Sequence, residues 1–382
     1  MEVVDVSVSR KINTRILLET IIENPGISRA DLSRATGLNK ATVSYIIKEL
    51  EDEGLIVFRN EKITTGARQA LAIDFNKEAG QQIVIELKRD HIGGFLVNLL
   101  GEFEYQTALS IEDKEYDVIK DDIIQVIQKI MSYADQQRVI AIGIVVPATV
   151  TLDKKINFAS YFNWKNVDLR YDIEQHFGIE TFLENEANLG AIAENNVYFH
   201  DTKDLININI DSGVGLGVVL DGQIQYGYSG FLGEFGHTTL VPNGKLCSCG
   251  NRGCFELYTS EHYVLEHYEA LRGTKASVSE FIEALREEEA YALAVYTEFI
   301  EYFTIGIHNL LVLLNPEIVV INSRIISEYA PSVEYVKAML VSKEINYCDI
   351  VVSKLPDTSS VIGMSNVITK SFLGIEKLSL FR

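Results

Sequence analysis

The sequence predicts an α/β protein that begins with a small winged helix-turn-helix head and continues into a larger body. Three observations lead to this prediction. Residues 10–75 have the pattern of three helices followed by two strands. From about residue 81, apolar strands alternate with long connections, as is typical of α/β domains. The chain has 382 residues, 47% of them hydrophobic, which is enough for two or three domains with cores of their own.

The first helix of the head is expected to start at Arg10 and to end at Pro25-Gly26, a pair that stops helices. A second helix is expected over 28–36, because Ser28 and Asp31 have the spacing of a capping box. The apolar residues of the first helix repeat at helical spacing and form one face: Ile12, Ile16, Leu17 and Ile21.

A third helix is expected between Asn39, a good N-cap, and Gly54. In helix-turn-helix proteins this helix enters the major groove, where its first turns meet the base edges. The polar residues there suit base-edge contacts, whereas Tyr45 is assigned either to the same face or to the core. The groove-facing polar residues are Lys40, Thr42 and Ser44, and the inner face holds Val43, Ile46, Ile47 and Leu50.

A wing is expected after the third helix, from strands at 55–58 and 70–75 and the loop between them. Arg68 lies at its tip, where a basic side chain can enter a minor groove. The alternative is a three-helix interaction module that does not contact DNA. The residues predicted to contact DNA are Ser28, Arg29, Asn39, Lys40, Ala41, Thr42, Ser44, Tyr45 and Arg68.

The net charge of −20 argues against a protein that coats DNA over its whole surface. Residues 1–70 nevertheless carry ten Lys or Arg and ten Asp or Glu, so all of the excess negative charge lies in the body. This distribution fits DNA contact confined to the head. The chain shows neither a signal-peptide core nor a run of the ~18 apolar residues that a membrane helix needs, so a cytoplasmic protein is expected.

The body is predicted to contain several buried strands. Residues 82–87 and 93–101 form an expected hairpin, and 140–148 is a continuous apolar run, typical of a strand that is buried on both faces. Further strands are expected at 205–210, 217–224 and 318–322.

A zinc site is predicted in the body. Cys247, Cys249 and Cys254 fall within eight residues, shortly after His237. One imidazole and three thiols suit a closed, tetrahedral structural zinc site, and in a cytosolic protein such clustering favours metal over disulfides. The alternative is a set of reduced thiols beside an unrelated histidine. Cys348 stands alone and is expected to be a free thiol.

Motifs spread over nearly the whole chain resemble those of the ROK family, which groups repressors, open reading frames and sugar kinases. The head is most similar to that of the xylose-responsive repressors of Gram-positive bacteria. The matching segments are 163–164, 182–194, 211–240, 247–260, 315–321 and 362–374.

The resemblance implies an actin-like, ribonuclease H-like fold with two lobes around a cleft. It gives a winged helix-turn-helix domain at 1–76 and a sugar-binding domain at 81–382. Lobe 1 is expected at about 81–190 together with a C-terminal helix at about 360–382, and lobe 2 at about 191–359.

The resemblance also implies the ligands. In the family, zinc is held by the residues that match His237, Cys247, Cys249 and Cys254. The positions that match the predicted sugar ligands bind sugar hydroxyls, and the carboxylates, amide and imidazole found there are suited to that role. One nitrogen of His237 would then take zinc while the other faces the sugar. The predicted sugar ligands are Asn185, Glu186, Glu234, His237 and Glu256.

The chain departs from the family's kinases at the residues that carry their chemistry. Glu186 stands where they have a general-base Asp, and residues 86–91 lack the glycines of their phosphate loop. Asp211 would repel a phosphate, and 322–324 replaces the glycine pair near the nucleotide base. We therefore expect no catalytic residue, no ATP and no enzymatic activity.

The sequence thus predicts a repressor. The same resemblance implies its partners: a palindromic operator DNA, a free sugar that releases the protein from this DNA, and further copies of the chain in a homodimer or a tetramer. Xylose or a related aldose is the expected effector, and no membrane partner is expected. The alternatives are a sugar kinase with an accessory DNA-binding head, a repressor that responds to another sugar, and a repressor whose body binds another protein.

Overall fold

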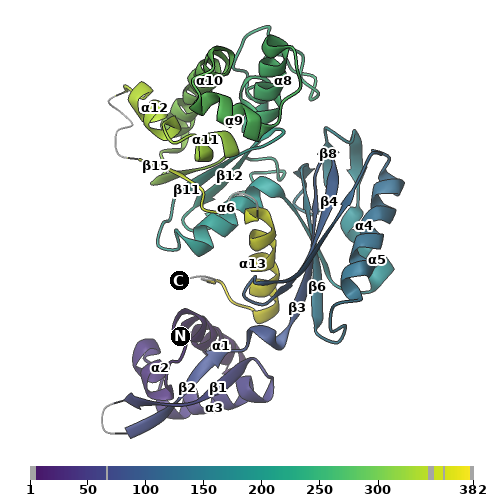
Figure 1. Cartoon of the computed structure of the whole chain (residues 1–382). Coiled ribbons are helices and arrows are strands. Elements are labelled where there is room, and N and C mark those ends of the chain that lie inside the picture. The colour runs from purple at the N-terminus through teal and green to yellow at the C-terminus, as the bar shows by residue number, and fades with distance from the viewer. Residues whose placement is uncertain (1–5, 66–67, 343–347, 356–357, 379–382) are drawn as a thin grey trace.

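The computed structural model describes residues 6–65, 68–342, 348–355 and 358–378. The chain forms a small head, drawn in purple in Figure 1, and a larger body built around two five-stranded sheets. The head consists of α1 (Val6–Glu23), α2 (Arg29–Thr36), α3 (Lys40–Asp52) and an antiparallel hairpin of β1 (Ile56–Thr65) and β2 (Arg68–Phe75).

Local capping sets where α2 and α3 begin, as the sequence predicted. The Ser28 hydroxyl accepts a hydrogen bond from the Asp31 backbone N–H at 3.1 Å and so caps α2. The Asn39 side chain caps α3 in the same way, through the Thr42 backbone N–H at 2.9 Å. The wing differs from expectation: its strands pair out to Thr65 and Arg68, and the intervening residues 66–67 lie outside the described residues.

The predicted inner face of α3 is confirmed, because its four apolar residues are all buried. Tyr45 is 56% exposed, so its assignment to the core is wrong and it stays on the outer face. In α1 the buried face includes Leu18 and Ile22, which the sequence analysis missed, whereas Ile12 is 40% exposed. The helix also begins before Arg10.

The first sheet of the body has the order β10-β6-β3-β4-β5. Helices α4 and α5 cover one face and α13 the other (Figure 1). The short helix η1 (Lys77–Ala79) joins the sheet to the head, and a small sheet of β7, β8 and β9 extends the lobe. The elements are β3 (Gln81–Leu87), β4 (His91–Asn98), β5 (Phe103–Ser110), α4 (Tyr116–Met131), β6 (Val139–Val146), β7 (Thr149–Val150), β8 (Ile156–Ala159), β9 (Trp164–Val167), α5 (Leu169–Phe177) and β10 (Thr181–Asn185).

The second sheet has the order β13-β12-β11-β14-β15 and packs against the long helix α10 and its neighbours. The elements are β11 (Leu205–Ile210), β12 (Val214–Leu220), β13 (Gln223–Ile224), η2 (Phe235–His237), α7 (Glu256–Thr259), α8 (Glu261–Arg272), α9 (Val278–Arg286), α10 (Ala290–Leu314), β14 (Ile318–Asn322), α11 (Arg324–Glu328), α12 (Ser332–Met339) and β15 (Asp349–Val352). The strands expected at 205–210 and 318–322 are confirmed as β11 and β14, whereas residues 217–224, expected as one strand, are divided between β12 and β13 by a turn.

Two packed helices, α6 (Glu186–Val197) and α13 (Ser359–Leu373), lie between the sheets (Figure 1). Their close contact requires glycine, because a Cβ at Gly363 would stand 2.0 Å from the Leu189 carbonyl oxygen. The C-terminal helix was expected to continue to about residue 382, but it ends at Leu373, where Gly374 adopts a left-handed conformation with φ of 61°.

Among the described helices, α10 alone is long and apolar enough to cross a membrane by length and composition. Glu298 and Glu301 interrupt its apolar residues, so the helix does not contain the uninterrupted apolar run that the sequence analysis looked for. The buried side of α10 contributes Phe299, Phe303 and Ile307 to the core of the second lobe. Core helices of soluble proteins pass the same test, so this single helix is weak evidence for a membrane span.

Candidate functional site

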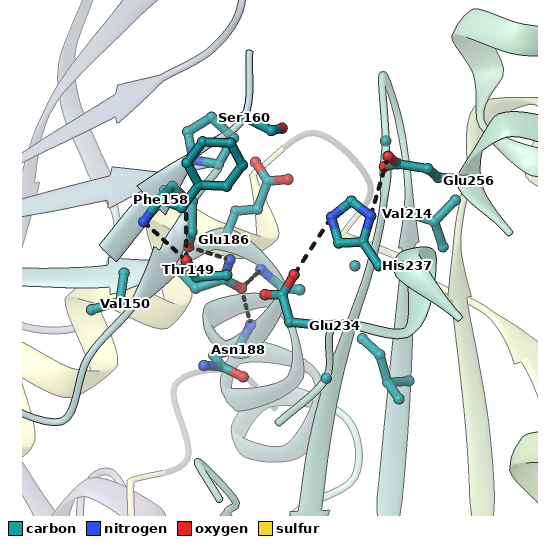
Figure 2. Close-up of a pocket in the computed structure, with 18 of the residues that line it drawn as sticks. Thr149, Val150, Phe158, Ser160, Glu186, Asn188, Val214, Glu234, His237 and Glu256 are labelled. Carbon is teal, nitrogen blue, oxygen red and sulfur yellow. Dashed lines mark hydrogen bonds and ion pairs between the residues drawn. The ribbon is translucent and has the colours of Figure 1, made fainter. Parts of the chain in front are cut away.

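A cavity of about 280 Å³ lies between the two lobes, and all five predicted sugar ligands line it. Asn185 ends β10 and Glu186 begins α6, so both belong to one strand-to-helix turn. Glu234 precedes η2, His237 ends it, and Glu256 opens α7. Figure 2 shows Glu186 on one side of the cavity and Glu234 and His237 on the other. The fold thus brings together residues that are far apart in the sequence.

The Asn185 side chain already has structural partners. Its Oδ1 accepts hydrogen bonds from the backbone N–H groups of Ala187 and Asn188, at 2.9 and 3.3 Å, and so caps α6. Its Nδ2 donates to the Ala148 carbonyl oxygen at 2.9 Å. One amide hydrogen therefore remains for a ligand. Asn185 mainly fixes the start of α6 at the edge of the cavity.

Glu184, one residue before Asn185, stabilises the strand-to-helix turn through its own hydrogen bonds. It is buried, and its Oε1 accepts hydrogen bonds from the Asn185 backbone N–H at 2.8 Å and from Asn188 Nδ2 at 3.1 Å. Its Oε2 pairs with Lys154 Nζ at 2.6 Å. The paired charge balances the burial of the carboxylate. Sequence reasoning missed this role, because nothing in the sequence predicts the contact with Lys154.

Glu186 lies in a poorly solvated part of the cavity. Burial raises the pKa of its carboxyl group to about 7, and the charge of Asp211 adds to the shift. Lys88 and Arg89 act in the opposite direction. Near neutral pH this carboxyl group can therefore either accept or donate a hydrogen bond to a hydroxyl.

His237 stands between two carboxylates. Its Nε2 is 3.7 Å from Glu234 Oε2, and its Nδ1 is 3.4 Å from Glu256 Oε1 (Figure 2). Nδ1 is also 3.6 Å from Cys247 Sγ. Burial raises the pKa of Glu234, Glu256 adds to this effect, and His237 counteracts it. The two ring nitrogens thus face different groups, with Nδ1 on the side of the thiols.

The four predicted metal ligands form one cluster, in which their ligand atoms all lie within 4.8 Å of one another. Tetrahedral zinc, with bonds of about 2.0–2.3 Å, would separate two sulfurs by about 3.8 Å and a sulfur from a nitrogen by about 3.6 Å. Cys249 Sγ and Cys254 Sγ are 3.7 Å apart, and Cys247 Sγ lies 3.6 Å from His237 Nδ1. The geometry and the soft donors therefore fit zinc.

The loop that carries the cysteines is tightly wound. Isolated bridges join Leu246 to Arg252 and Thr239 to Cys254. Gly253 has φ of 75°, and a Cβ there would lie 1.7 Å from a backbone oxygen. Because only glycine fits at this point, the loop can return and place its thiols beside His237.

Several cavity residues were not predicted. Arg89 lies over the ring of Tyr161, with its guanidinium carbon 5.1 Å from the ring centroid, and both line the cavity. Asn157, Ser160 and Ser212 line it as well. No sequence motif marks these positions. They become visible only when the small sheet β7–β9 and the end of the β3–β4 hairpin are placed over the cavity.

Charged side chains lie where the sequence departs from the family's kinases, at 86–91 and near 322–324. Lys88 Nζ lies 3.9 Å from Glu86 Oε2 in the first lobe and 3.8 Å from Asp211 Oδ2 in the second. Near 322–324, the Glu261 carboxylate accepts hydrogen bonds from the Ser323 hydroxyl and from the Arg324 backbone N–H. Carboxylates thus lie in or beside both segments in which the sequence departs from the family's kinases, and Lys88 pairs with two of them.

The head presents the outer side of α3 to solvent. Lys40, Ala41, Ser44 and Tyr45 are exposed, as is the cap residue Asn39, and Thr42 is half-buried. Two other predicted DNA contacts have different surroundings. Ser28 is fully buried as the cap of α2, so its side chain does not face solvent, whereas the exposed Arg29 lies over the Phe58 ring. Arg68 begins β2, but its side chain lies outside the described part of the structure.

Comparison with known proteins identifies the family. The model of the ROK family matches residues 82–371. The chain belongs to the ROK family. A model of winged helix-turn-helix DNA-binding domains also matches residues 10–57. The fold of this ROK member is therefore the one that the sequence predicted, with a winged head in front of a two-lobed domain.

Curated relatives match over the full length of this ROK chain. The xylose repressor of Bacillus spizizenii is 33% identical over 387 residues, which cover 99% of this chain and 100% of the relative. The xylose repressor of Bacillus subtilis is 33% identical over 380 residues, covering 98% and 99%.

Among solved structures, a ROK family transcriptional regulator described as a homologue of the Escherichia coli Mlc protein superposes with a TM-score of 0.80. It is 25% identical, and the match covers 96% of this chain and 98% of that one. A ROK family glucokinase from Streptomyces griseus, 22% identical, shares the fold with a TM-score of 0.67 over 75% of this chain and 99% of its own.

Proposed function

We propose that this protein is a sugar-responsive transcriptional repressor, with xylose as its effector. The observation that carries the proposal is a full-length match to two xylose repressors, in a chain whose interlobe cavity gathers five polar ligands. Both parts of a sugar-controlled switch, a DNA-binding head and a sugar cavity, are thus contained in one polypeptide.

The cavity supplies the hydrogen-bonding groups that an aldose needs. The Glu234 and Glu256 carboxylates accept from hydroxyls, the remaining Asn185 amide hydrogen donates, and Glu186 can do either. Hydrogen bonds that involve charged groups contribute about 1.5–3 kcal/mol each, so a few of them give useful affinity. Tyr161 adds an aromatic face at the rim of the cavity.

In the head, α3 would enter the major groove with Lys40, Thr42 and Ser44 against base edges. Asn39, Ala41 and Tyr45 flank this surface, and Arg29 and Arg68 would add backbone or minor-groove contacts. This assignment is supported by the exposure of the outer side of α3. The neutral head on an acidic body also favours contact by the head alone.

Zinc would be held by His237 Nδ1 and the three thiols, and it would supply structural rigidity there. Because Glu256 follows Cys254 by two residues and contacts Cys247, the residues that bind the metal also fix a sugar ligand. Burial raises the pKa values of the Cys247 and Cys254 thiols. A bound cation would counteract this rise, because it stabilises the deprotonated thiolates that act as its ligands.

A regulator that is not an enzyme is supported by the names of the full-length relatives and by the charges around the cavity. The Asp211 and Glu261 carboxylates stand where the kinases of this fold need donors for phosphate and base, and they would repel ATP.

For the switch, we propose that sugar favours a closed arrangement of the lobes, because its ligands come from both of them. In a homodimer, closure would alter the spacing of the heads, which must match half-sites about 34 Å apart or multiples of that distance. Converting a 99% competent population into a 99% incompetent one requires a preference of about 5.5 kcal/mol for the closed form.

Titration calorimetry of the purified protein with xylose, arabinose, glucose and glucose 6-phosphate tests the proposal. We expect xylose to bind and to release the protein from a DNA duplex that it has itself selected from a random-sequence library. A response to another free sugar would show that xylose is not the effector but would leave the proposed repressor function intact. Failure to select any duplex would contradict the proposed function.

A further inference from the structure

The head is attached to the body by more than the link near η1. Residues 374–378, here called the tail, leave the end of α13 and pack against α1. One continuous apolar cluster joins the head, the tail, α13 and the end of α6. Its members include Leu17, Leu18 and Ile21 of α1, Ile375 and Leu378 of the tail, Ile362 of α13, and Ala193 and Val197 of α6.

A polar contact fixes the tail on α1. The Glu19 Oε1 atom accepts hydrogen bonds from the backbone N–H groups of Glu376 and Lys377, at 2.9 and 3.0 Å. One carboxylate oxygen thus receives two charge-assisted bonds, which makes this contact specific in direction as well as favourable. Arg15, one turn earlier on α1, pairs with the Glu376 carboxylate. Both contacts lie near the surface, but Glu19 makes two hydrogen bonds to the backbone of the tail, so it fixes the tail more firmly than the single ion pair does.

Behind this contact lies a basic residue that touches α6. Lys370, near the end of α13, donates from Nζ to Asn196 Oδ1 at 3.2 Å. Burial lowers the pKa of Lys370, and the negative charge of Glu19 opposes this shift. Lys370 is therefore close enough to interact with Glu19 in the head and with Asn196 in α6 at the same time.

Helix α6 connects the two regions directly. Its first residue, Glu186, lines the sugar cavity, and its last residues, Asn196 and Val197, belong to the junction with the tail. Its 12 residues span about 18 Å. Because α13 and β12 pack closely along it, a shift of its first turn has to move its far end as well.

We propose that sugar binding in the interlobe cavity is transmitted to the DNA-binding head through α6 and the tail, which Glu19 anchors on α1. Glu19 is then a positioning residue: it contacts neither sugar nor DNA, but it fixes the orientation of α1 relative to the body. The inference rests on the proposed function and deepens it, because it names the path by which sugar controls the head.

The test uses the full-length protein, a fluorescent duplex that the wild type has selected from a random library, and xylose. Glu19→Ala removes the anchor, and Glu53→Ala removes one exposed carboxylate from the head as a charge-matched control. We expect both variants to bind xylose with a dissociation constant within about twofold of the wild type. Xylose should weaken DNA binding of the control as in the wild type, but the fold-weakening should shrink at least fivefold in Glu19→Ala, since allosteric coupling commonly amounts to about 5–150-fold.

A second measurement does not need the sugar. Because coupling is reciprocal, duplex binding should change amide hydrogen exchange in the first turn of α6 in the wild type and in Glu53→Ala, but not in Glu19→Ala. Exchange at Glu376 and Lys377 should quicken about tenfold or more in Glu19→Ala, which reports that the anchor is lost. Leu378→Ser, which disturbs the apolar side of the tail, should reproduce the loss of coupling.

The outcomes separate the two proposals. If the wild type selects no duplex, or no sugar releases it, the proposed function fails. If the wild type responds normally and Glu19→Ala responds equally, although its tail amides exchange faster, the coupling role of the tail is overturned while the repressor function stands. Unchanged exchange at Glu376 and Lys377 in Glu19→Ala would overturn the anchor itself.

Discussion

At the scale of single residues, Glu256 joins two functions. Its Oε1 lies 3.2 Å from Cys247 Sγ and 3.4 Å from His237 Nδ1, and its side chain also lines the sugar cavity. Glu256 lines the interlobe cavity and does not belong to the apolar cluster that joins the head to the body, so a change here is expected to alter sugar binding and to leave DNA binding unchanged.

Glu256→Gln is expected to weaken xylose affinity by about 1.5–3 kcal/mol, the usual worth of a hydrogen bond to a charged group. Operator affinity without sugar should stay unchanged, so the variant should remain on DNA at xylose concentrations that release the wild type. Calorimetry and fluorescence anisotropy measure the two affinities. A variant that no longer binds xylose, yet still leaves the duplex when xylose is added, would sink the model.

Glu186 should impose a pH dependence on stability. Its pKa is about 7 in the folded chain against a model value of 4.5, because burial disfavours the charged form. Between these values the folded state holds a proton that the unfolded state has lost, so this residue makes stability fall as pH rises from about 4.5 to 7. Urea unfolding at pH 5 and pH 7 should show a smaller fall for Glu186→Gln than for the wild type; equal falls would show that Glu186 is already ionised.

The roles of these residues were only partly readable in the sequence. The family-like segment 182–194 predicted that Asn185 and Glu186 belong to the site, and both line the cavity. The segment did not predict that most hydrogen bonds of the Asn185 side chain are made within the protein, where they cap α6. Arg89 was treated as part of a lost phosphate loop, and its stacking on Tyr161 depends on a tertiary contact that no local pattern encodes.

At the scale of elements, the cysteine loop and η2 depend on the proposed zinc. Backbone hydrogen bonds, such as those from Cys247 N–H to the Asn251 oxygen and from Gly253 N–H to the Lys245 oxygen, already shape the loop, and zinc would add bonds to the three thiols and His237. Without the metal, the loop would lose these bonds and the Cys247 thiol would remain close to the Glu256 carboxylate.

Cys249→Ser should lower zinc content, thermal stability and xylose affinity together, since one loop carries both sets of ligands. Cys348→Ser is the matched control, because this half-buried thiol lies outside the cluster and should leave all three unchanged. Elemental analysis, thermal unfolding and calorimetry report the three quantities. Wild-type protein purified without chelator that contains much less than one zinc per chain would remove the claim.

The recognition helix α3 offers a second test at this scale. Thr42→Ala should change the preference between operator variants by about 1–3 kcal/mol, because Thr42 is proposed to contact a base edge. Lys48→Ala, further along the same helix on an exposed side, should weaken binding to all sequences alike if it acts at all. Competition binding with single-base operator variants measures the difference. A uniform loss in Thr42→Ala would contradict its assignment to base recognition.

Elements were predictable where local chemistry decides them. Ser28 and Asn39 cap their helices as expected, because capping depends on residues only three positions apart. The length of the wing was not predictable, because it depends on pairing across strands. The end of the C-terminal helix was missed although Gly374 is a typical helix terminator. The tail could not be foreseen, since its partners lie hundreds of residues away.

At the scale of the whole molecule, the chain shares its fold with a ROK family glucokinase, but it lacks the glycines of the expected phosphate loop. In that region Lys88 pairs with Glu86 of the first lobe and with Asp211 of the second. The proposed closure of the lobes on sugar would use the same two-lobed shape.

We expect no ATP-dependent phosphorylation of xylose or glucose by the purified protein. The reason is that residues 86–91 lack the glycines of the kinase phosphate loop and that the Asp211 carboxylate would repel a nucleotide phosphate. A coupled assay that detects ADP formation checks this, with a ROK glucokinase as positive control. Turnover in the usual kinase range of about 1–100 per second would show that the repressor also acts as an enzyme.

The tail has a consequence for how the protein is made. Arg15 and Glu376 are separated by 361 residues, so the head leaves the ribosome long before the tail that contacts it has been made. The head can form its own helices early, but it can be fixed by the tail only after that segment is synthesised. Polypeptides that stop short of residue 374 would carry a head without its fixed orientation, so truncated products of translation would bind sugar without controlling the head.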